Sequence, residues 1–378
     1  MQGFLTTHRG MEDIAALEVK ELIGQSPTAN ETCVIFDIKD YEGLFKLCYK
    51  SQSAIGVYCL LYEFNFDNII EDFNKALDKI DFSEWLSKNS QFKVKCIKNY
   101  DDSISTQEIE KKLGELVISN IQKRCNYKQK VNLDKPDITI FVYLIGKRCY
   151  VCIDFAGFDL SKRAYNIFVH PAAIKGTIGY YLVRLSSYSK NETLLDPFSG
   201  SGTIPIEAAL FASNFSINFF SKEKFAFLKF GKFKDFDFNR LFKKLDKEML
   251  DNKLKIFSID SSMKYVNHAK KNSKIAGIDK KISFSRMDTE WLDTKFDKGQ
   301  IDKIITKMPS FQNKWVSDVY NEFFYQAEFI LNKQGKIVLI GSKELVKKYL
   351  AKYNFIISDE RAVFSGKKEH NVFVLSKK

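Results

Sequence analysis

Residues 193–209 read TLLDPFSGSGTIPIEAA, and this pattern predicts a strand, a tight turn and a helix in immediate succession. Leu194 and Leu195 form a short apolar run that suits a buried strand. Gly200 and Gly202 permit a sharp turn and let a ligand approach the backbone without a Cβ atom in the way. The stretch therefore predicts a ligand-binding loop between a strand and a helix.

Polar groups at the two ends of this turn narrow the choice of ligand. Asp196 places a carboxylate at the end of the predicted strand, and Thr203 is the expected N-cap of a helix whose first N–H groups are free. A dinucleotide loop requires a third glycine where Pro205 stands, and a P-loop requires a lysine, which is absent between Asp196 and Leu210. A third candidate is S-adenosylmethionine, whose methyltransferases combine an acidic residue, G-x-G and a helix.

The segment DPFSGSGTIPIEAA (196–209) closely resembles the first motif of RNA methyltransferases that carry a THUMP domain, especially those that modify guanine N2. The resemblance implies that S-adenosylmethionine binds at this loop. A glycine turn that binds no ligand, or a different one, remains the alternative. The implied cofactor-binding candidates in the loop are Asp196, Phe198, Ser199, Gly200, Ser201, Gly202 and Thr203.

Strands and helices alternate over residues 182–378, which predicts an α/β domain with a mostly parallel, doubly wound sheet. The last two predicted strands, 354–357 and 371–375, lie on either side of Gly366. They suit the antiparallel pair that ends the Rossmann-like class I methyltransferase fold. An insertion rich in Phe and Lys, residues 215–251, is expected to bury its rings on the sheet rather than to stack on bases.

Two smaller units precede this domain. Residues 1–64 form a small α+β pattern, and GMED (10–13) resembles the start of the N-terminal ferredoxin-like domain in THUMP enzymes. Within residues 65–157, KVNLDKPDITIFVYLI (130–145) closely resembles the THUMP domain. That resemblance implies the capture of structured RNA, typically the end of a tRNA acceptor stem. The helix and strands alone are equally consistent with an ordinary α+β domain that has a lysine-rich surface.

Residues 158–181 are predicted to be a linker. Lys162, Arg163 and Tyr165 place cations beside an aromatic ring, which suits phosphate contact and stacking, although a solvated linker explains them equally well. The segment HPAAIKGT (170–177) resembles one that lies against the cofactor in this family. Its histidine is expected to be structural, because no nucleophile or carboxylate stands at a recognisable spacing.

Two further acids follow predicted strands and complete the implied cofactor site. Asp260 stands where a carboxylate can accept from both ribose hydroxyls, and Asp288 is placed to accept from the adenine amino group. Each acid alone is also explained as a helix cap. Three acids in order after successive strands favour a cofactor site, and the neighbours Ser261 and Thr289 join the candidates.

The methyl-acceptor site is expected after the predicted strand 301–305, where the resembled enzymes carry Asn/Asp-Pro-Pro-aromatic. Residues 306–311 here read TKMPSF, so that only one proline matches. In the resembled motif, oxygens accept both N–H bonds of an exocyclic amine and the aromatic ring stacks on the base. A charged lysine offers no acceptor at all. The catalytic candidates by position are Lys307, Met308, Pro309 and Ser310.

The composition of the chain limits which binding partners and which cellular compartment are expected. The net charge of +12 favours a polyanion such as RNA, with a lysine-rich solvated surface as the alternative. No apolar run approaches the ~20 residues of a membrane span, and residues 1–13 lack a signal-peptide pattern, so a cytoplasmic protein is expected. Cys149 and Cys152 have CxxC spacing on a predicted strand, which points the sulfurs to opposite faces and predicts no metal site.

The expected fold is thus α/β, a Rossmann-like class I methyltransferase domain preceded by α+β ferredoxin-like and THUMP domains. Two functional hypotheses remain. The first is a monomeric S-adenosylmethionine-dependent enzyme that methylates guanine N2 in the acceptor-stem region of tRNA, with ribosomal RNA as the alternative substrate. The second is a catalytically impaired homologue that binds tRNA through its THUMP domain. The loop around Lys307 discriminates between them.

Overall fold

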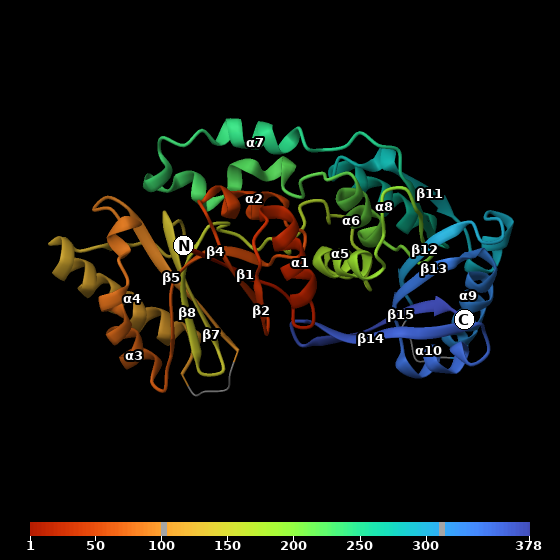
Figure 1. The fold of residues 1–378 in the computed structure, drawn as a ribbon, viewed down its shortest axis with the longest axis horizontal. Coiled ribbons are helices and arrows are strands. Elements are labelled where there is room, and N and C mark those ends of the chain that lie inside the picture. The colour runs from red at the N-terminus through yellow and green to blue at the C-terminus, as the bar shows by residue number, and fades with distance from the viewer. Residues whose placement is uncertain (100–103, 310–313) are drawn as a thin grey trace.

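Two lobes, each built around one β-sheet, make up the elongated molecule (Figure 1). The computed structural model describes residues 1–99, 104–309 and 314–378. The N-terminal lobe contains an eight-stranded sheet and the C-terminal lobe a seven-stranded sheet. Within the described residues, the helices are all too short or too polar to cross a membrane.

Eight strands form the N-terminal sheet: β1 (Gln2–Thr6), β2 (Thr28–Asn30), β3 (Cys33–Asp37), β4 (Gly56–Asn65), β5 (Gln91–Asn99), β6 (Lys130–Val131), β7 (Ile138–Ile145) and β8 (Arg148–Asp154). Their order is β2-β3-β1-β4-β8-β7-β5-β6. The antiparallel pair of β4 with β8 joins the two N-terminal units expected from the sequence into one continuous sheet. The division expected at residue 64 falls inside β4.

One face of this sheet is covered by helices. They are α1 (Glu12–Ile23), α2 (Glu42–Lys50), α3 (Ile69–Ala76) and α4 (Thr106–Cys125), with the 3₁₀ turns η1 (Leu77–Lys79) and η2 (Phe82–Glu84). Apolar residues of all four helices share one buried cluster with that face. Cys149 belongs to this cluster, whereas Cys152 packs with Phe4 and Tyr58 in a cluster on the other face. The predicted divergence of the two thiols is confirmed, and the pair cannot hold one ion between its sulfurs.

The C-terminal sheet confirms the predicted α/β class. Its strands are β9 (Thr193–Asp196), β10 (Lys255–Asp260), β11 (Ile282–Arg286), β12 (Ile301–Lys307), β13 (Leu331–Ile340), β14 (Phe355–Ser365) and β15 (Lys368–Lys377). Their order is β11-β10-β9-β12-β13-β15-β14. Strands β9 to β13 pair in parallel, and β15 runs antiparallel to both of its neighbours, as predicted for the closing pair.

Helices cover both faces of the C-terminal sheet. On one face lie α5 (Gly176–Leu185), α6 (Thr203–Ala212) and α8 (Met263–Ile275), and on the other α9 (Lys314–Ile330) and α10 (Lys343–Leu350). The 3₁₀ turns η6 (Asp279–Lys281) and η7 (Thr289–Thr294) connect elements at the β11 edge. Helix α6 is buried on nearly all sides, because α5 packs on the side that faces away from the sheet. Helix α5 begins inside the segment that was expected to be a linker.

The Phe-rich insertion buries most of its rings, but chiefly on the N-terminal lobe rather than on the C-terminal sheet. It comprises η3 (Phe219–Lys224), η4 (Ala226–Lys229), η5 (Gly231–Phe233) and α7 (Phe238–Asp246). In Figure 1, α7 lies along the top of the N-terminal lobe, and the segment after it runs on to the C-terminal lobe. Phe225 and Phe227 are fully buried, and the Phe227 ring centroid lies 4.6 Å from that of Phe45 in α2. The predicted burial of the rings is therefore confirmed, but the prediction that they pack on the C-terminal sheet was wrong. The insertion joins the two lobes.

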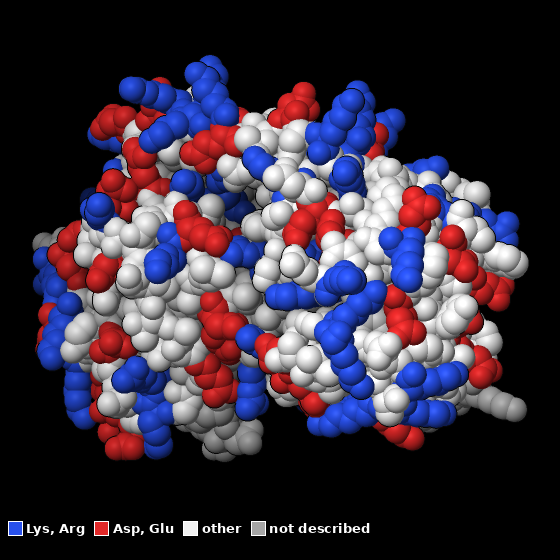
Figure 2. All heavy atoms as spheres, turned by 45° about the vertical axis from the view of Figure 1, so that its right-hand side comes forward, with Lys and Arg blue, Asp and Glu red and all other residues white. Residues whose placement is uncertain are grey.

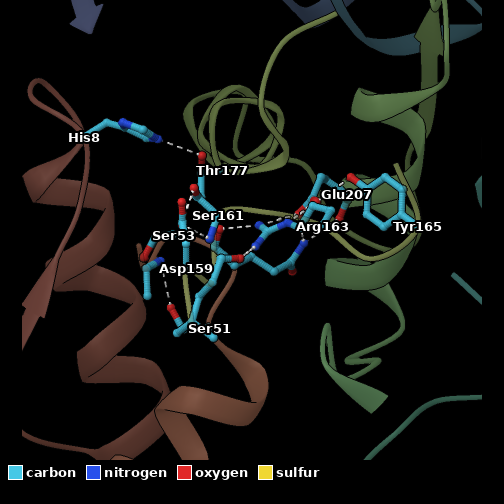
Figure 3. A network of polar contacts seen from close by, with 12 residues as sticks. His8, Ser51, Ser53, Asp159, Ser161, Arg163, Tyr165, Thr177 and Glu207 are labelled. Carbon is cyan, nitrogen blue, oxygen red and sulfur yellow. Dashed lines mark hydrogen bonds and ion pairs between the residues drawn. The ribbon is translucent and has the colours of Figure 1, made fainter. Parts of the chain in front are cut away.

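A second junction between the lobes is polar and buried (Figure 3). Arg163 and Tyr165 of the connecting segment both hydrogen-bond the carboxylate of Glu207 in α6, at 2.7 Å each. Gln52, which follows α2, donates to the same carboxylate at 2.6 Å. Arg163 and Tyr165 are 8% and 4% exposed. Both sequence interpretations of these two residues, RNA contact and a solvated linker, were therefore wrong, because their partner lies 42 or more positions away in the chain.

Candidate active site

A cavity of about 900 Å³ opens at the carboxyl ends of the parallel strands β9, β10, β11 and β12. Its walls come from the loops after these strands, from residues 170–174, and from α9 and the start of β15. In parallel sheets with helices on both faces, ligands bind at this edge because the strand ends and helix N-termini converge there. Of the residues expected at the cofactor, the cavity is lined by Asp196, Phe198, Ser199, Gly200, Ser201, Thr203, Asp260, Ser261, Asp288 and Thr289.

The glycine loop turns as expected, but its two glycines face different neighbours. Both have positive φ, +51° at Gly200 and +83° at Gly202. A Cβ atom at Gly200 would stand 3.2 Å from the His170 ring, at the cavity wall. A Cβ atom at Gly202 would stand 2.8 Å from that of Ala269 in α8, and Gly202 lies outside the cavity lining. Gly200 therefore shapes the ligand site, whereas Gly202 permits close packing of two helices.

The expectation that Thr203 caps α6 was wrong. The N-cap is Gly202 in the left-handed conformation, and Thr203 is the first helical residue. The turn is held instead by the backbone, since Gly202 N–H donates to Ser199 O at 2.8 Å and Ser199 N–H donates to Ile259 O at 2.9 Å. The loop is thereby tied to the end of β10.

Asp196 is buried beneath the loop, with 1% of its surface exposed. Its Oδ1 accepts from the Thr306 hydroxyl at 2.6 Å and from the Phe198 N–H at 3.2 Å. Burial outweighs these two hydrogen bonds and raises the pKa of the carboxyl to about 7. Asp196 thus links the end of β9 to the end of β12, which carries the acceptor loop.

Asp196→Asn is expected to remove a pH dependence of stability. The folded-state pKa of about 7 lies above the unfolded value of about 3.9, so Asp196 stabilises the fold at low pH and loses this contribution as pH rises toward 7. Wild type should therefore lose roughly 1 kcal/mol per pH unit relative to the variant between pH 5 and pH 6. Denaturant unfolding at several pH values measures the difference, and identical slopes for the two proteins would contradict the expectation.

Asp260 is half-buried at the end of β10, and backbone donors fix its carboxylate. Oδ2 accepts from Gly200 N–H and Oδ1 from Ser262 N–H, both at 2.9 Å. Each oxygen keeps a second lone pair, and Asp260 lines the cavity. Asp288 is exposed at the start of η7 and lines the cavity beside Asp260. The two carboxylates therefore present acceptors to one ligand.

Residues 170–174, within the connector, form another part of the cavity wall. His170 packs its ring edge-on against Tyr265 of α8, with 4.2 Å between the ring centroids. Its Nδ1 accepts from the Ala172 N–H at 3.0 Å, and burial lowers the pKa of the imidazole. The ring is thus held as part of the wall, which agrees with the structural role expected for it.

The acceptor loop lies at the other end of the cavity. Lys307, Met308 and Pro309 all line the cavity, and Ser310 lies outside the described residues. The Lys307 amine donates to the carbonyl of Ala172, which also lines the cavity. The Met308 N–H donates to Ile340 O of β13 at 2.9 Å, which fixes the loop to the sheet.

Several lining residues carried no signal in the sequence. Trp315, Asp318 and Glu322 share one face of α9, and Lys368 comes from the hairpin at the far edge of the sheet. The spacing of the three α9 residues predicts that they share one face of a helix. It does not predict that this face lines the cavity. Lys368 is about 60 positions from the acceptor loop, so only the pairing of β15 with β13 brings it there.

Comparisons with known proteins agree with this architecture. A profile described as the RMKL-like methyltransferase domain matches residues 163–369, and a THUMP domain profile matches residues 68–154. A tRNA (guanine(6)-N2)-methyltransferase from Methanocaldococcus jannaschii is 33% identical over 386 aligned residues, which cover 100% of both chains. Another from Archaeoglobus fulgidus is 25% identical, covering 91% of this chain and 83% of its own.

A solved structure shares the whole fold. A crystal structure of a possible methylase from Clostridium difficile superposes with a TM-score of 0.86 over 100% of this chain and 98% of that one, at 22% identity. The methyltransferase profile covers more than half of the chain and the archaeal relative covers all of it. The chain therefore belongs to the THUMP-domain RNA methyltransferase family.

Proposed function

We propose that the protein transfers a methyl group from S-adenosylmethionine to N2 of a guanine in the acceptor stem of tRNA. The observation that carries this proposal is that one cavity is lined by the three strand-end carboxylates and by the acceptor loop at residues 307–309. The archaeal relatives are named for guanine 6 of tRNA, which makes that base the first one to test here.

The donor side of the cavity fits an adenosine-containing ligand. When bound, S-adenosylmethionine supplies an electrophilic methyl group. The cavity volume of about 900 Å³ lies within the usual range for small-molecule sites. Asp260, whose two oxygens are already oriented by backbone N–H groups, would accept from the ribose hydroxyls. Asp288 would accept from the adenine amino group, and Gly200 lets the loop approach the ligand.

The acceptor side offers groups that suit an extruded base. Trp315 lines the cavity with 59% of its surface exposed, so its ring is available to stack on a purine. The main-chain carbonyl of Met308 is the proposed acceptor for one N–H bond of the guanine amine. Pro309 and Ser310 complete the catalytic loop in this assignment.

RNA capture is assigned to the N-terminal lobe, where the THUMP profile matches. On the face drawn in Figure 2, lysine and arginine side chains are interspersed with acidic ones. Attraction to RNA is therefore attributed to the net charge of +12. We assign residues 1–64 to the ferredoxin-like unit, 65–157 to THUMP, 158–181 to the connector and 182–378 to methyl transfer, in a protein that acts as a cytoplasmic monomer.

Asp260→Ala is expected to weaken S-adenosylmethionine binding by about 1–3 kcal/mol, the cost of leaving buried polar groups unpaired. Isothermal titration calorimetry measures the change in the dissociation constant. Asp297→Ala is the matched control, because Asp297 is exposed and outside the cavity lining. Equal affinities for Asp260→Ala and wild type would show that the ribose contact lies elsewhere.

The decisive experiment incubates purified protein with methyl-labelled S-adenosylmethionine and unmodified tRNA transcripts, and in a parallel reaction with unmodified ribosomal RNA transcripts. We expect label in N2-methylguanosine, and its loss when guanine 6 is replaced. Label that moves to another guanine would correct the position, and label only in ribosomal RNA would overturn the tRNA assignment. Saturable binding of cofactor and tRNA without transfer would establish the alternative, a tRNA-binding homologue without activity.

A further inference from the structure

We propose that Lys307 accepts the proton that leaves guanine N2 during methyl transfer, acting as an uncharged amine. The inference rests on the proposed function and assigns a catalytic role to the residue that departs most from the motif of related enzymes. A neutral amine has a lone pair that can accept a hydrogen bond, whereas an ammonium group has donors only.

The geometry sets Lys307 at the centre of the acceptor site. It is the last residue of β12, two positions before Pro309, and it lines the cavity. Its amine donates a hydrogen bond to the Ala172 carbonyl on the facing wall. That bond leaves one further N–H and the lone pair of a neutral amine for other partners. The amine is therefore held at a fixed place in the wall of the cavity.

The surroundings disfavour charge on this amine. Burial lowers the pKa of Lys307 to about 8, with a smaller contribution from Lys368. Among the described residues, the ion pairs within 4.0 Å do not include Lys307. His370 of β15 is 6% exposed and has its own pKa lowered to about 4 by burial, Lys307 and Lys368, so that positive charge is crowded here.

Other ionisable groups also face the cavity. His170 lies on the wall that carries Ala172, and carboxylates line the remaining sides: Asp196, Asp260, Asp288, Glu290, Asp318 and Glu322. The carboxyl of Asp196 has its pKa raised to about 7, and it hydrogen-bonds Thr306 rather than Lys307. The pKa of Lys307 is set by burial of the amine and by Lys368, both of which lower it.

The proposed step balances in atoms and charge. Guanine N2 forms a bond to the methyl carbon as the carbon–sulfur bond of the donor breaks, and the electron pair of that bond stays on sulfur. The proton on N2 passes to the lone pair of Lys307 Nζ, which becomes an ammonium group and later releases the proton to water. Lys307 thereby supplies the acceptor that a side-chain oxygen supplies in related enzymes.

The first test measures single-turnover methyl transfer against pH with enzyme in excess over tRNA. With a pKa of about 8, the uncharged fraction of Lys307 and the rate should rise by about 25-fold between pH 6.5 and pH 8.5. Lys307→Arg keeps a permanent charge, so it should lose about 100-fold at pH 8.5, progressively less toward pH 6.5, and show a flat profile over this range. Lys307→Asn should retain transfer with no step near pH 8. An active Lys307→Arg protein with the wild-type pH profile would overturn the inference.

The second test needs no catalysis. Amine-selective labelling of the ligand-free protein across pH, read by mass spectrometry of peptides, should give a midpoint near pH 8 for Lys307. Lys368→Met removes a neighbouring cation and should move that midpoint upward, together with the midpoint of the rate profile. A purely structural lysine would show the shift in the labelling midpoint but no shift in the midpoint of the rate profile. A midpoint near the ordinary lysine value of about 10.4 would overturn the inference.

The two proposals fail in different ways. Absence of methyl transfer at every pH, with labelling that still gives a midpoint near pH 8, would reject the proposed function and with it this role for the amine. Methyl transfer whose rate shows no step attributable to Lys307 would leave the proposed function intact and reject the role of Lys307 alone.

Discussion

Arg163→Ala is expected to lower the free energy of unfolding by about 3–5 kcal/mol, the usual cost of leaving one member of a buried ion pair without its partner. Glu207 has no exposed surface. It accepts from Arg163 Nε at 2.7 Å, from Gln52 at 2.6 Å and from the Tyr165 hydroxyl at 2.7 Å. Arg163 also donates to Leu160 O at 2.7 Å. Removing its side chain therefore strands a carboxylate and two carbonyl groups inside the junction of the two lobes (Figure 3).

Thermal and denaturant unfolding measure this loss. The double variant Arg163→Met with Glu207→Leu should recover much of it, because replacing both partners by apolar side chains removes the unpaired charge. Lys75→Ala is the matched control, since the Lys75–Asp72 pair is on the surface with a lysine 74% exposed, and such pairs contribute about 0–1 kcal/mol. A loss below about 1 kcal/mol for Arg163→Ala would mean that water or rearrangement satisfies Glu207.

Gly202→Val is expected to destabilise the C-terminal lobe by about 2–5 kcal/mol, which combines backbone strain with overpacking. Gly202 has φ of +83°, a conformation that a β-branched residue rarely adopts. Any Cβ atom there would lie 2.8 Å from the Cβ and 3.1 Å from the Cα of Ala269 in α8. Because α8 cannot move without disturbing β10 and β11, the strain cannot be relieved locally.

Chemical denaturation and S-adenosylmethionine titration together test this expectation. We expect weaker cofactor binding in step with lower stability, because Gly202 N–H holds Ser199 at the cavity wall. Gly231→Ala is the control: a Cβ atom there meets no other atom within 4 Å. Wild-type stability for Gly202→Val would show that α6 and α8 can separate without cost, against the close packing seen here.

Much of the candidate site could be predicted from local sequence. Asp196, Asp260 and Asp288 follow strands that pair in parallel, so their side chains meet at one edge of the sheet. The glycine turn followed from the need for positive φ, which Gly200 adopts. The cap of α6 was misassigned to Thr203, because a threonine after a glycine fits the first helical position as well as the N-cap.

Other features had no local signature. The many phenylalanines of the insertion indicated that its rings would be buried. They did not indicate that Phe227 would pack against Phe45 of the N-terminal lobe. Arg163 looked like a surface cation because its partner, Glu207, is 44 positions away. The environment of the Lys307 amine depends on Ala172, which is 135 positions away.

The sequence by itself determined the α/β class, the strand–loop–helix around Asp196 and the set of strand-end acids, because each depends on spacing within one or two elements. Only the tertiary structure decided that Gly202 faces a helix rather than the ligand, and that Lys307 lies half-buried near a second lysine. How tightly a residue is packed and how far it is removed from water depend on the residues that surround it in the folded protein. Spacing along the chain does not encode which distant residues those neighbours are.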